Sequence, residues 1–403
     1  MSIPLEVGSP MTIAPTLTLT QAAQRSWDVV VAGSGPAGAM AARECARMGM
    51  SVLLLDKSSF PRWKVCGSCL NAVATSTLAA VGLGPLPERL GAIPLRRLHL
   101  AAGNRVASIN LPGGVALSRV ALDAALVHAA IESDVDFLPE TRVIWSAHSR
   151  TTNGVTCLRD GRQAEVTSSI VLAATGLGTK LGSKQAPFVT TSASGSRVGA
   201  ATVAHRAPSF YSPETIYMGC GSGGYVGLVR LEDGSLGIAA AIDPRAVKHE
   251  RGVGSAATRI HDEAGMPTVP ALRDCGWFGT APLTRHTPTP GGHRLLVLGD
   301  AAGYVEPFTG DGIAWALASG VAVAPLARRA IRKWDPSIVD EWTALHRRIV
   351  DRRRFACRAV TKLLRHPTLT RATIRLLSHL PQIAAPLVEW LNRPFAKMEV
   401  YRP

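Results

Sequence analysis

The sequence has no uninterrupted apolar stretch long enough to cross a bilayer, which takes about 18 residues or more. The nearest candidate, Ile313–Ala327, contains Ser319 and Gly320, and we expect it to form a helix buried inside the fold. The first 25 residues lack the basic start of a secretory signal peptide. We therefore expect a cytoplasmic protein with a flexible tail over residues 1–25 and no membrane-spanning helix.

Aromatic residues and cysteines are scarce. Phe, Trp and Tyr make up 5% of the chain and no recognised nucleic-acid-binding motif is present, so nucleic acid is not an expected partner. The seven cysteines are odd in number and scattered, which favours free thiols in a reducing compartment over a disulfide framework. One CxxC pair, Cys66 and Cys69, has no second CxxC or spaced His pair that would complete a zinc site, so no metal is predicted.

Acidic residues are outnumbered: 44 Lys and Arg face 29 Asp and Glu, which gives a net charge of +15. The excess is concentrated in residues 328–375, which hold 14 Lys and Arg against four acids. Apolar residues are mixed with these arginines, as in a basic amphipathic region that lies on an anionic membrane surface. Two interpretations stay open, a region peripheral to the membrane and a packed helical cap with a solvated charged rim.

The first of two glycine-rich segments follows the valine-rich run Trp27–Ala32, which predicts a buried strand. It reads GSGPAG at residues 33–38 and precedes a helical segment, Met40–Met48. Its glycines permit a tight turn, close approach of a pyrophosphate and helix–strand packing. Asp56 ends the next predicted strand, where a carboxylate accepts hydrogen bonds from ribose hydroxyls and repels a 2′-phosphate. A dinucleotide of the NAD or FAD type is therefore predicted.

The second glycine-rich segment is Leu296–Gly320. A predicted buried strand ends at Gly299-Asp300, and an apolar helix opens after Gly310-Asp311-Gly312. An acid at a strand end can hold a polyol hydroxyl, and the free N–H groups of a helix N-terminus stabilise a group that becomes anionic. Reduced flavin is such a group, because its charge develops near N1 and the C2 carbonyl. The two segments together indicate FAD.

The remaining segments predict the rest of the architecture. Leu117–Ser133 reads as an amphipathic helix capped by Ser118, and period-two runs between residues 180 and 290 indicate an antiparallel sheet. We predict an α/β protein with an α+β substrate part. Its Rossmann-like FAD-binding domain comprises residues 26–90, 115–180 and 290–330, its inserted antiparallel-sheet substrate domain residues 91–114 and 181–289, and its basic helical C-terminal region residues 331–403.

GSGPAG and GDAAGYVEPFTGDGI resemble the corresponding segments of FAD-dependent oxidoreductases of the p-hydroxybenzoate-hydroxylase-like superfamily. FPRWKVCG at residues 60–67 is similar to the Pro-Arg-x-Lys-x-Cys-Gly loop of the geranylgeranyl reductase family. The resemblance implies that Asp56 binds the adenosine ribose, that Asp300 binds the ribityl chain and that Cys66 is a catalytic residue at the reactive face of the flavin. The implied FAD-binding residues are Gly33, Gly35, Pro36, Ala37, Gly38, Asp56, Gly67, Arg119, Gly299, Asp300, Gly310, Gly312 and Ile313.

The same resemblance implies three functions. The first is reduction of carbon–carbon double bonds in a small apolar substrate; the second is monooxygenation of an aromatic or polyketide-type substrate, and the third a non-enzymatic flavin redox partner. The stretch ATGLGTKLG at residues 174–182 lacks the Asp of the hydroxylases, and only Tyr225 remains of the reductases' Tyr-Trp-Phe-Pro signature. No second nucleotide-binding loop is found, so the electron donor stays open between NAD(P)H, ferredoxin and reduced flavin.

Three further features keep alternatives open. Cys66 and Cys69 predict a thiol–disulfide relay, a single positioned Cys66, or packing alone. Arg62 and Lys64, on either side of Trp63, are either solvated loop charges or anchors for an FAD phosphate or an anionic substrate. His286 and His293 lie on the approach to the last predicted strand and are candidates for a general acid.

Overall fold

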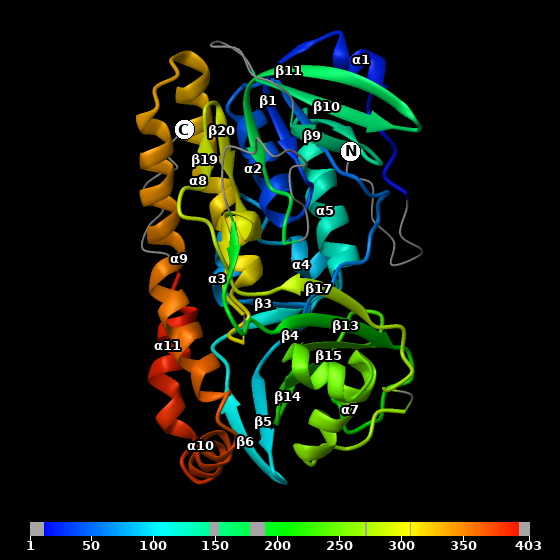
Figure 1. The fold of residues 1–403 in the computed structure, drawn as a ribbon, viewed down its shortest axis with the longest axis vertical. Coiled ribbons are helices and arrows are strands. Elements are labelled where there is room, and N and C mark those ends of the chain that lie inside the picture. Colours follow the sequence, from blue (N-terminus) through cyan, green and yellow to red (C-terminus); the bar gives the residue numbers. More distant parts are fainter. Residues whose placement is uncertain (1–11, 146–152, 178–189, 271, 307, 395–403) are drawn as a thin grey trace.

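The computed structural model describes residues 12–145, 153–177, 190–270, 272–306 and 308–394. The molecule is elongated, with one sheet in each half and a long helix, α9 (Ser337–Leu363), running alongside both (Figure 1). Among the described helices, none combines the length and the apolar character needed to cross a membrane.

The first half is built on an eight-stranded sheet with the order β19-β20-β11-β1-β2-β8, to which β10 and β9 are added through β11. The pairs that β1 makes with β11 and β2 are parallel, as are β2 with β8 and β11 with β20. The strands are β1 (Ser26–Ala32), β2 (Val52–Leu55), β8 (Asp136–Leu138), β9 (Arg142–Trp145), β10 (Asn153–Arg159), β11 (Arg162–Ala173), β19 (Gly291–Gly292) and β20 (Leu295–Val297). All four residues of β2 are buried, as the continuous apolar run predicts for a parallel sheet covered on both faces.

The helices α2 (Pro36–Arg47), α5 (Arg119–Ile131) and α8 (Gly312–Arg332) cover this sheet. Helix α2 begins at Pro36, earlier than the predicted Met40, because proline is tolerated in a first turn. The apolar run predicted to be a buried helix is confirmed as α8, whose residues Ile313–Ala324 are all buried. Pro325 lies inside α8 and does not end it.

Close packing of α2 on α8 depends on Gly320. A Cβ atom at this position would lie 2.5 Å from the carbonyl oxygen of Ala37 and 2.9 Å from Cβ of Met40. The glycine therefore lets the two helices that follow the glycine-rich segments approach each other directly. Helix α5 begins after Ser118, whose hydroxyl accepts a hydrogen bond from the backbone N–H of Ala121, so the predicted N-cap is confirmed.

Residues 12–25 do not form the predicted flexible tail. They contain α1 (Leu19–Ala23), and Ile13, Leu17 and Ala22 are buried in the cores of the first half. These apolar side chains pack against the sheet. The segment is also hydrogen-bonded to the sheet, since the backbone N–H of Thr16 donates to the carbonyl oxygen of Phe137. Residues 1–11 of the predicted tail lie outside the described residues.

The second half is a seven-stranded sheet with the order β17-β13-β16-β15-β14-β5-β6, in which only the β14–β5 pair is parallel. Its strands are β5 (Arg97–Ala102), β6 (Arg105–Asn110), β13 (Val198–Ala204), β14 (Thr215–Gly221), β15 (Gly224–Arg230), β16 (Leu236–Ile242) and β17 (Phe278–Pro282). Helix α7 (Val253–Glu263) covers one face. The predicted fold class, a parallel sheet with a separate antiparallel sheet and C-terminal helices, is confirmed; the domain boundaries remain a prediction.

Small elements connect the two halves. They include the three-stranded sheets β3-β7-β4 and β12-β18-β21. Their bounds, with those of the short helices, are β3 (Cys69–Asn71), β4 (Ile93–Pro94), β7 (Gly114–Ala116), β12 (Thr191–Ser192), β18 (Arg285–His286), β21 (Gly303–Tyr304), α3 (Ala72–Ala80), α4 (Leu86–Arg89), α6 (Pro244–His249) and η1 (Gly299–Ala302).

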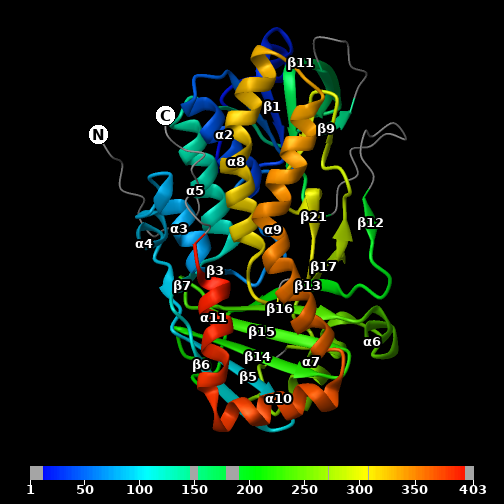
Figure 2. The same ribbon diagram turned by 90° about the vertical axis from the view of Figure 1, so that its left-hand side faces the viewer.

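The C-terminal helices close the open face of the second sheet. After α9 come α10 (Pro367–His379), η2 (Pro381–Ala384) and α11 (Ala385–Asn392). Figure 2 shows α10 crossing the lower end of the molecule, where it packs on β5 and β6, and α11 turning back towards the first half. The prolines at 336, 367, 381 and 386 stand at or next to helix starts, where a missing N–H is harmless.

Candidate active site

A cavity of about 790 Å³ joins the two halves of the molecule. One end is formed by the glycine-rich segments of the first half and carries charged side chains, including Asp56, Arg62, Arg119 and Asp300. The other end is enclosed by the second sheet and the C-terminal helices. We call the first the charged end and the second the apolar end.

The first glycine-rich segment forms a tight turn at the charged end. Gly33 has φ +102°, and a Cβ atom there would lie 2.4 Å from the carbonyl oxygen of Ala174. Gly35 caps α2 without a side-chain hydrogen bond, so the N-terminus of this helix opens onto the cavity. Backbone N–H groups and the helix dipole at this place suit a pyrophosphate.

Gly38 has a different role from its neighbours. Gly33, Gly35, Pro36 and Ala37 line the cavity, whereas Gly38 does not. A Cβ atom at Gly38 would lie 1.7 Å from the carbonyl oxygen of Gly33. Gly38 therefore has a packing role, which keeps α2 against the turn, and its contact with a pyrophosphate stays a prediction.

Asp56 is held firmly in the wall of the cavity. Its Oδ2 accepts hydrogen bonds from the backbone N–H (2.9 Å) and hydroxyl (2.8 Å) of Ser34, and its Oδ1 accepts one from the backbone N–H of Ser58 (3.0 Å). Burial alone would raise the pKa of Asp56, but Arg62 and these hydrogen bonds outweigh it and hold the pKa below its usual range. The carboxylate stays ionised, and Oδ1 keeps acceptor capacity for a ribose hydroxyl.

Two arginines share a fully buried carboxylate beside the turn. Arg119 makes a bidentate pair with Asp123, at 2.7 and 2.8 Å. Arg62 lies 3.4 Å from Asp123 and 3.5 Å from Asp56. Nε and Nη1 of Arg62 are buried and have no hydrogen-bond partner among the described residues. Because both guanidinium groups lie next to Gly35, they can neutralise a pyrophosphate there.

Sequence reasoning left Arg62 open between a solvated charge and an anchor, and the structure excludes the solvated alternative because Arg62 is only 8% exposed. Lys64 is exposed but lines the cavity. Asp123 was missed. Its spacing of four residues from Arg119 in a predicted helix is the signal that would have found it.

The loop with Cys66 and Gly67 also reaches the charged end, and both residues line the cavity. The backbone N–H of Ser68 donates to Sγ of Cys66 (3.4 Å), and Cys66 lies close enough to Arg119 to interact with its charge. Both cysteines are free thiols. Burial raises the pKa of the Cys69 thiol to about 12, and the thiol donates to the carbonyl oxygen of Gly67 (3.2 Å). A relay through Cys69 is therefore disfavoured, since its thiolate is hard to form.

Asp300 lies at the start of η1, directly after the buried strand β20, and lines the cavity next to Gly299. Its carboxyl group makes no hydrogen bond within the described part of the chain. Burial raises the pKa of Asp300 to about 6, although Arg119, Lys64 and Arg354 oppose the shift. The Asp300 carboxylate thus faces the cavity without a hydrogen-bond partner among the described residues. A polyol hydroxyl that donates to it would compensate the cost of desolvating the carboxylate.

The N-terminus of α8 forms the adjoining wall. Gly310, Gly312 and Ile313 all line the cavity. A Cβ atom on Gly312 would lie 3.0 Å from the hydroxyl oxygen of Tyr304, so the glycine makes room for this ring. The first-turn N–H groups of α8 are therefore available to a group that becomes anionic at this place.

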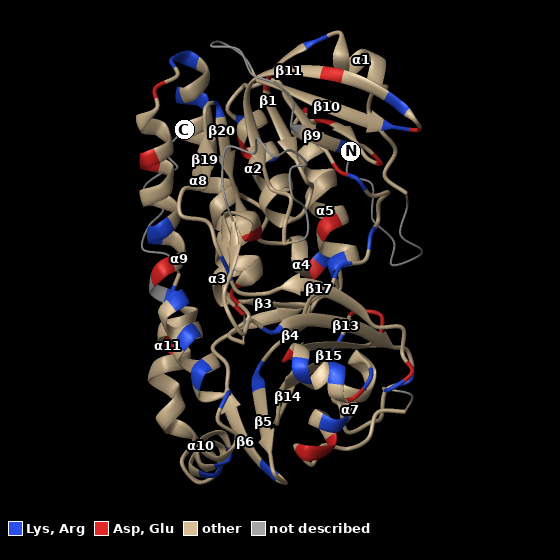
Figure 3. Ribbon diagram, in the orientation of Figure 1, with Lys and Arg blue, Asp and Glu red and all other residues tan. Residues whose placement is uncertain are grey.

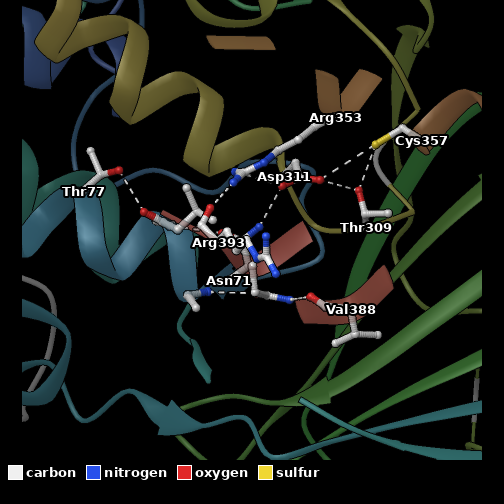
Figure 4. Close-up of polar contacts among 12 residues, drawn as sticks. Asn71, Thr77, Thr309, Asp311, Arg353, Cys357, Val388 and Arg393 are labelled. Atoms are coloured by element: carbon white, nitrogen blue, oxygen red, sulfur yellow. Dashed lines mark hydrogen bonds and ion pairs between the residues drawn. The ribbon is translucent and has the colours of Figure 1, made fainter. Parts of the chain in front are cut away.

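Asp311, the N-cap of α8, was not singled out from the sequence. Figure 4 shows it at the centre of a polar network that joins four parts of the chain. It accepts hydrogen bonds from Asn71 Nδ2 (2.9 Å) and the Thr309 hydroxyl (2.5 Å), and Arg353 lies 3.8 Å away. Cys357 on α9 contacts Thr309 at 2.9 Å.

The network continues into the C-terminal helices. Arg353 donates to the carbonyl oxygen of Arg393, and the backbone N–H of Ala72 donates to Oδ1 of Asn392 (3.3 Å). Burial raises the pKa of Asp311, although Thr309, Arg353, Asn71 and Cys357 oppose the shift. These contacts connect the loop before α8 to Asn71, at the end of β3, and to Arg353 and Cys357 on α9.

The apolar end is built from residues far apart in the sequence. The second sheet contributes Leu98, Leu100, Ile109, Ile216 and Met218, and the C-terminal helices contribute Val360, Ile374, Leu377, Leu387, Val388 and Leu391. Tyr225, retained from the reductase signature, lines the cavity with Phe308, and their ring centroids are 5.0 Å apart. Neither His286 nor His293 lines the cavity, so the structure gives no support to these two candidates for a general acid.

The residues at the charged end fit FAD. The tight turn and the N-terminus of α2 suit the pyrophosphate, Asp56 the ribose, and Asp300 the ribityl hydroxyls. The N-terminus of α8 suits the flavin ring. The residues 178–182 of the stretch that lacks the hydroxylase Asp lie outside the described residues.

Comparison with known proteins identifies relatives of this arrangement. A family model of the FAD binding domain matches residues 26–334. Digeranylgeranylglycerophospholipid reductase 2 of Methanothermobacter thermautotrophicus is 30% identical over 322 residues, which cover 76% of this chain and 78% of the relative. Menaquinone reductase of Mycobacterium tuberculosis is 27% identical over 354 residues, or 79% of this chain and 81% of the relative.

Solved structures share the fold. A geranylgeranyl bacteriochlorophyll reductase-like protein of Thermoplasma acidophilum has a TM-score of 0.72 and 18% identity, covering 88% of this chain and 92% of that protein. The p-nitrophenol 4-monooxygenase of Pseudomonas putida has a TM-score of 0.73 and 14% identity, covering 91% and 99%. At these identities the likeness concerns the fold alone, and reductases and monooxygenases are equally close to it.

Proposed function

Since this chain belongs to the FAD binding domain family and is an FAD-dependent oxidoreductase, we propose that it reduces carbon–carbon double bonds of an apolar, isoprenoid-type substrate. The observation that carries the proposal is one continuous cavity, which runs from the charged end to an end lined by apolar side chains of the second sheet and the C-terminal helices. Relatives that are named as reductases of a digeranylgeranyl lipid and of menaquinone support the same substrate class.

FAD, when bound, supplies the two-electron hydride chemistry that such a reduction needs. This chain's residues would bind and orient it: the turn at Gly33 and Gly35 with the α2 N-terminus, Asp56 and Asp300 as acceptors for hydroxyls, and Arg119 as a cation. The α8 N-terminus at Gly312 would stabilise negative charge on the ring. The apolar walls exclude water from the reacting carbons.

Reduction of an alkene also needs a proton for the second carbon. Tyr225 and Tyr304 line the cavity where its two ends meet. Burial raises the pKa of both phenols well above the usual range, so they stay protonated at neutral pH. We expect one of them to hold the proton; Tyr225→Phe and Tyr304→Phe, assayed for product formation at equal FAD content, would identify it, and full activity in both variants would remove the assignment.

Cys66 is proposed as a positioned thiol beside the flavin, with Cys69 in a packing role. Cys66→Ser should lower kcat without loss of FAD, whereas Cys69→Ser should retain activity, because only the Cys66 sulfur lies beside Arg119. Equal losses in both variants would instead support the relay. If Cys66→Ser retains full activity, the Cys66 thiol has only a packing role.

Anaerobic turnover tests the function itself. The FAD-loaded protein is reduced with dithionite and given a geranylgeranyl-bearing lipid without oxygen. The expected product has gained one hydrogen molecule per reduced double bond, while the same protein stripped of FAD gives none. Product that forms only with oxygen and contains an oxygen atom from it would overturn the proposal in favour of the monooxygenase. Reoxidation without any changed substrate would favour a redox partner.

A further inference from the structure

The C-terminal helices present large apolar side chains to solvent. Of the ten exposed large hydrophobic residues in the described part of the chain, six lie between residues 369 and 390. They are Leu369 (53% exposed), Leu376 (50%), Leu380 (42%), Ile383 (53%), Leu387 (44%) and Trp390 (37%), which together we call the apolar ridge. Contiguous exposed apolar surface of this kind marks a place that another apolar phase covers.

The ridge is separate from the faces with which these helices pack on the protein. On α10, Thr370 and Ile374 are buried. Leu369, Leu376 and Leu380, spaced by seven and four residues, occupy a different stripe of the helix. The packing of α10 on β5 and β6 is therefore already complete without the ridge.

The segment formed by η2 and α11 repeats this arrangement. Ala384, Val388 and Leu391 follow an inner stripe with spacings of four and three, and Val388 and Leu391 line the cavity. Ile383, Leu387 and Trp390 follow the outer stripe with the same spacings. A tryptophan at the end of an exposed leucine-rich stripe is typical of helices that lie in the membrane interface.

The charge around the ridge is mostly positive. Residues 352–394 contain nine Lys and Arg and a single acid, Glu389. Arg371 and Arg375 on α10 are exposed and spaced by four, so they share one face of the helix, roughly 100–160° around its axis from Leu369 and Leu376. Figure 3 shows Lys and Arg along α9 and α10, and it shows Asp and Glu on the upper and middle parts of α9. The positive excess complements an anionic lipid surface, to which each basic residue adds attraction.

The ridge also lies next to the cavity. Leu387 both belongs to the ridge and lines the cavity, and Leu377, Val388 and Leu391 line it from the neighbouring positions of the same helices. The segment α10–η2–α11 is thus one layer thick, with the apolar end on one side and the apolar ridge on the other.

We propose that the apolar ridge docks in the interfacial region of an anionic lipid bilayer, with Arg371 and Arg375 at the head groups, and that apolar substrate enters the cavity from the bilayer beside Leu387. The ridge lies on the membrane, since the helices that carry it are too short to span one. Docking follows from the surface alone, whereas substrate entry rests on the proposed function.

Vesicle flotation tests the docking. The FAD-loaded full chain is mixed with vesicles of phosphatidylcholine and phosphatidylglycerol, and with phosphatidylcholine vesicles as the uncharged comparison. We expect binding to the anionic vesicles, weakened at least tenfold by high salt. Leu376→Glu, Leu380→Glu and Ile383→Glu combined should abolish it, because they place three charges on the ridge. Phe210→Glu, at an exposed apolar residue of the second half away from the ridge, is the matched control and should bind as the wild type does.

The two parts of the proposal fail separately. No binding of the wild type to anionic vesicles, or unchanged binding of the triple variant, overturns the docking. A dimer seen by sedimentation that the triple variant loses, together with no vesicle binding, would assign the ridge to a second copy of the chain. The triple variant should still reduce a detergent-dispersed substrate but lose at least tenfold of its rate on vesicle-borne substrate. Vesicle binding without any alkene reduction would refute the proposed function and leave the docking intact.

Discussion

The two ends of the cavity are built in different ways. At the charged end, hydrogen bonds and ion pairs fix Asp56, Arg62 and Arg119 beside the N-terminus of α2. At the apolar end, side chains such as Met218 and Ile374 meet without directional contacts. A fixed polar cradle suits a cofactor of one shape, whereas apolar walls suit a substrate recognised by burial of its surface.

The largest effect should come from breaking the turn at the charged end. Gly38→Ala places a Cβ atom 1.7 Å from the carbonyl oxygen of Gly33, which is backbone and cannot move aside. We expect a loss of more than about 3 kcal/mol in the free energy of unfolding and no retained flavin. Absorbance of bound flavin and circular dichroism measure both. Gly276→Ala is the control, because nothing lies within 4 Å of its Cβ position; a yellow, folded Gly38→Ala would contradict the assigned packing role.

The second prediction concerns the network that joins the two ends. Asp311→Ala leaves Asn71 Nδ2 without its acceptor and removes the carboxylate that faces Arg353. Loss of one partner from a buried charged pair costs about 3–5 kcal/mol. Denaturant unfolding should show this loss, and limited proteolysis should cut first within the C-terminal helices. Asp311→Asn, which keeps an acceptor, should lose less; equal losses would place the effect in the ionic charge alone.

The third prediction sharpens the charged end through pH. The carboxylate of Asp300 accepts flavin hydroxyls best when ionised, and its pKa without FAD is raised to about 6. FAD affinity should therefore rise as pH increases through about 6, by at most tenfold per pH unit below it. The unliganded protein should show the reverse, with Asp300 destabilising it increasingly as pH rises from its ordinary pKa to about 6.

Asp300→Asn separates this effect from others. It should lower FAD affinity roughly 10- to 100-fold at neutral pH, since hydrogen bonds to charged groups contribute about 1.5–3 kcal/mol. It should also flatten the pH dependence measured by fluorescence titration. Asp340→Asn on the exposed surface of α9 is the control. An unchanged pH profile in Asp300→Asn would assign the titration to another group.

We expect the smallest effect from a substitution that changes only the apolar end of the cavity. Ala239 on β16 lines the cavity, and Ala239→Phe would fill part of it. We expect unchanged FAD content and a KM for a long apolar substrate raised about tenfold, as overpacking of roughly 1.4 kcal/mol gives. A short-chain substrate is the internal control and should be affected less. Loss of FAD in this variant would show that cofactor binding at the charged end depends on the packing of the apolar end.

Much of the charged end was accessible from the sequence because its parts are local. The strand–turn–helix around Gly33, the cap at Ser118 and the buried helix α8 follow from periodicity and residue type over one or two turns of chain. The segment 12–25 was mispredicted as flexible because its few apolar residues, such as Ile13 and Leu17, become significant only against the finished sheet.

The network around Asp311 was inaccessible for the same physical reason. Asn71 lies 240 residues before Asp311, and Ala72 lies 320 residues before its partner Asn392. No local propensity encodes contacts at these separations. His286 and His293 illustrate the converse, since residues with suitable chemistry near a predicted strand end proved to lie away from the cavity.

The sequence by itself determined that this chain forms a dinucleotide turn, a second flavin-type segment and a basic C-terminal region, because glycine geometry, apolar periodicity and charge act over short stretches of chain. Only the tertiary structure decided that Arg62 and Arg119 share Asp123, that residues 12–25 pack on the sheet, and that some apolar side chains of α10 and α11 line the cavity while others are exposed. Those outcomes depend on which surfaces meet when distant segments bury their apolar area together, and that choice is made by the packing of the whole chain.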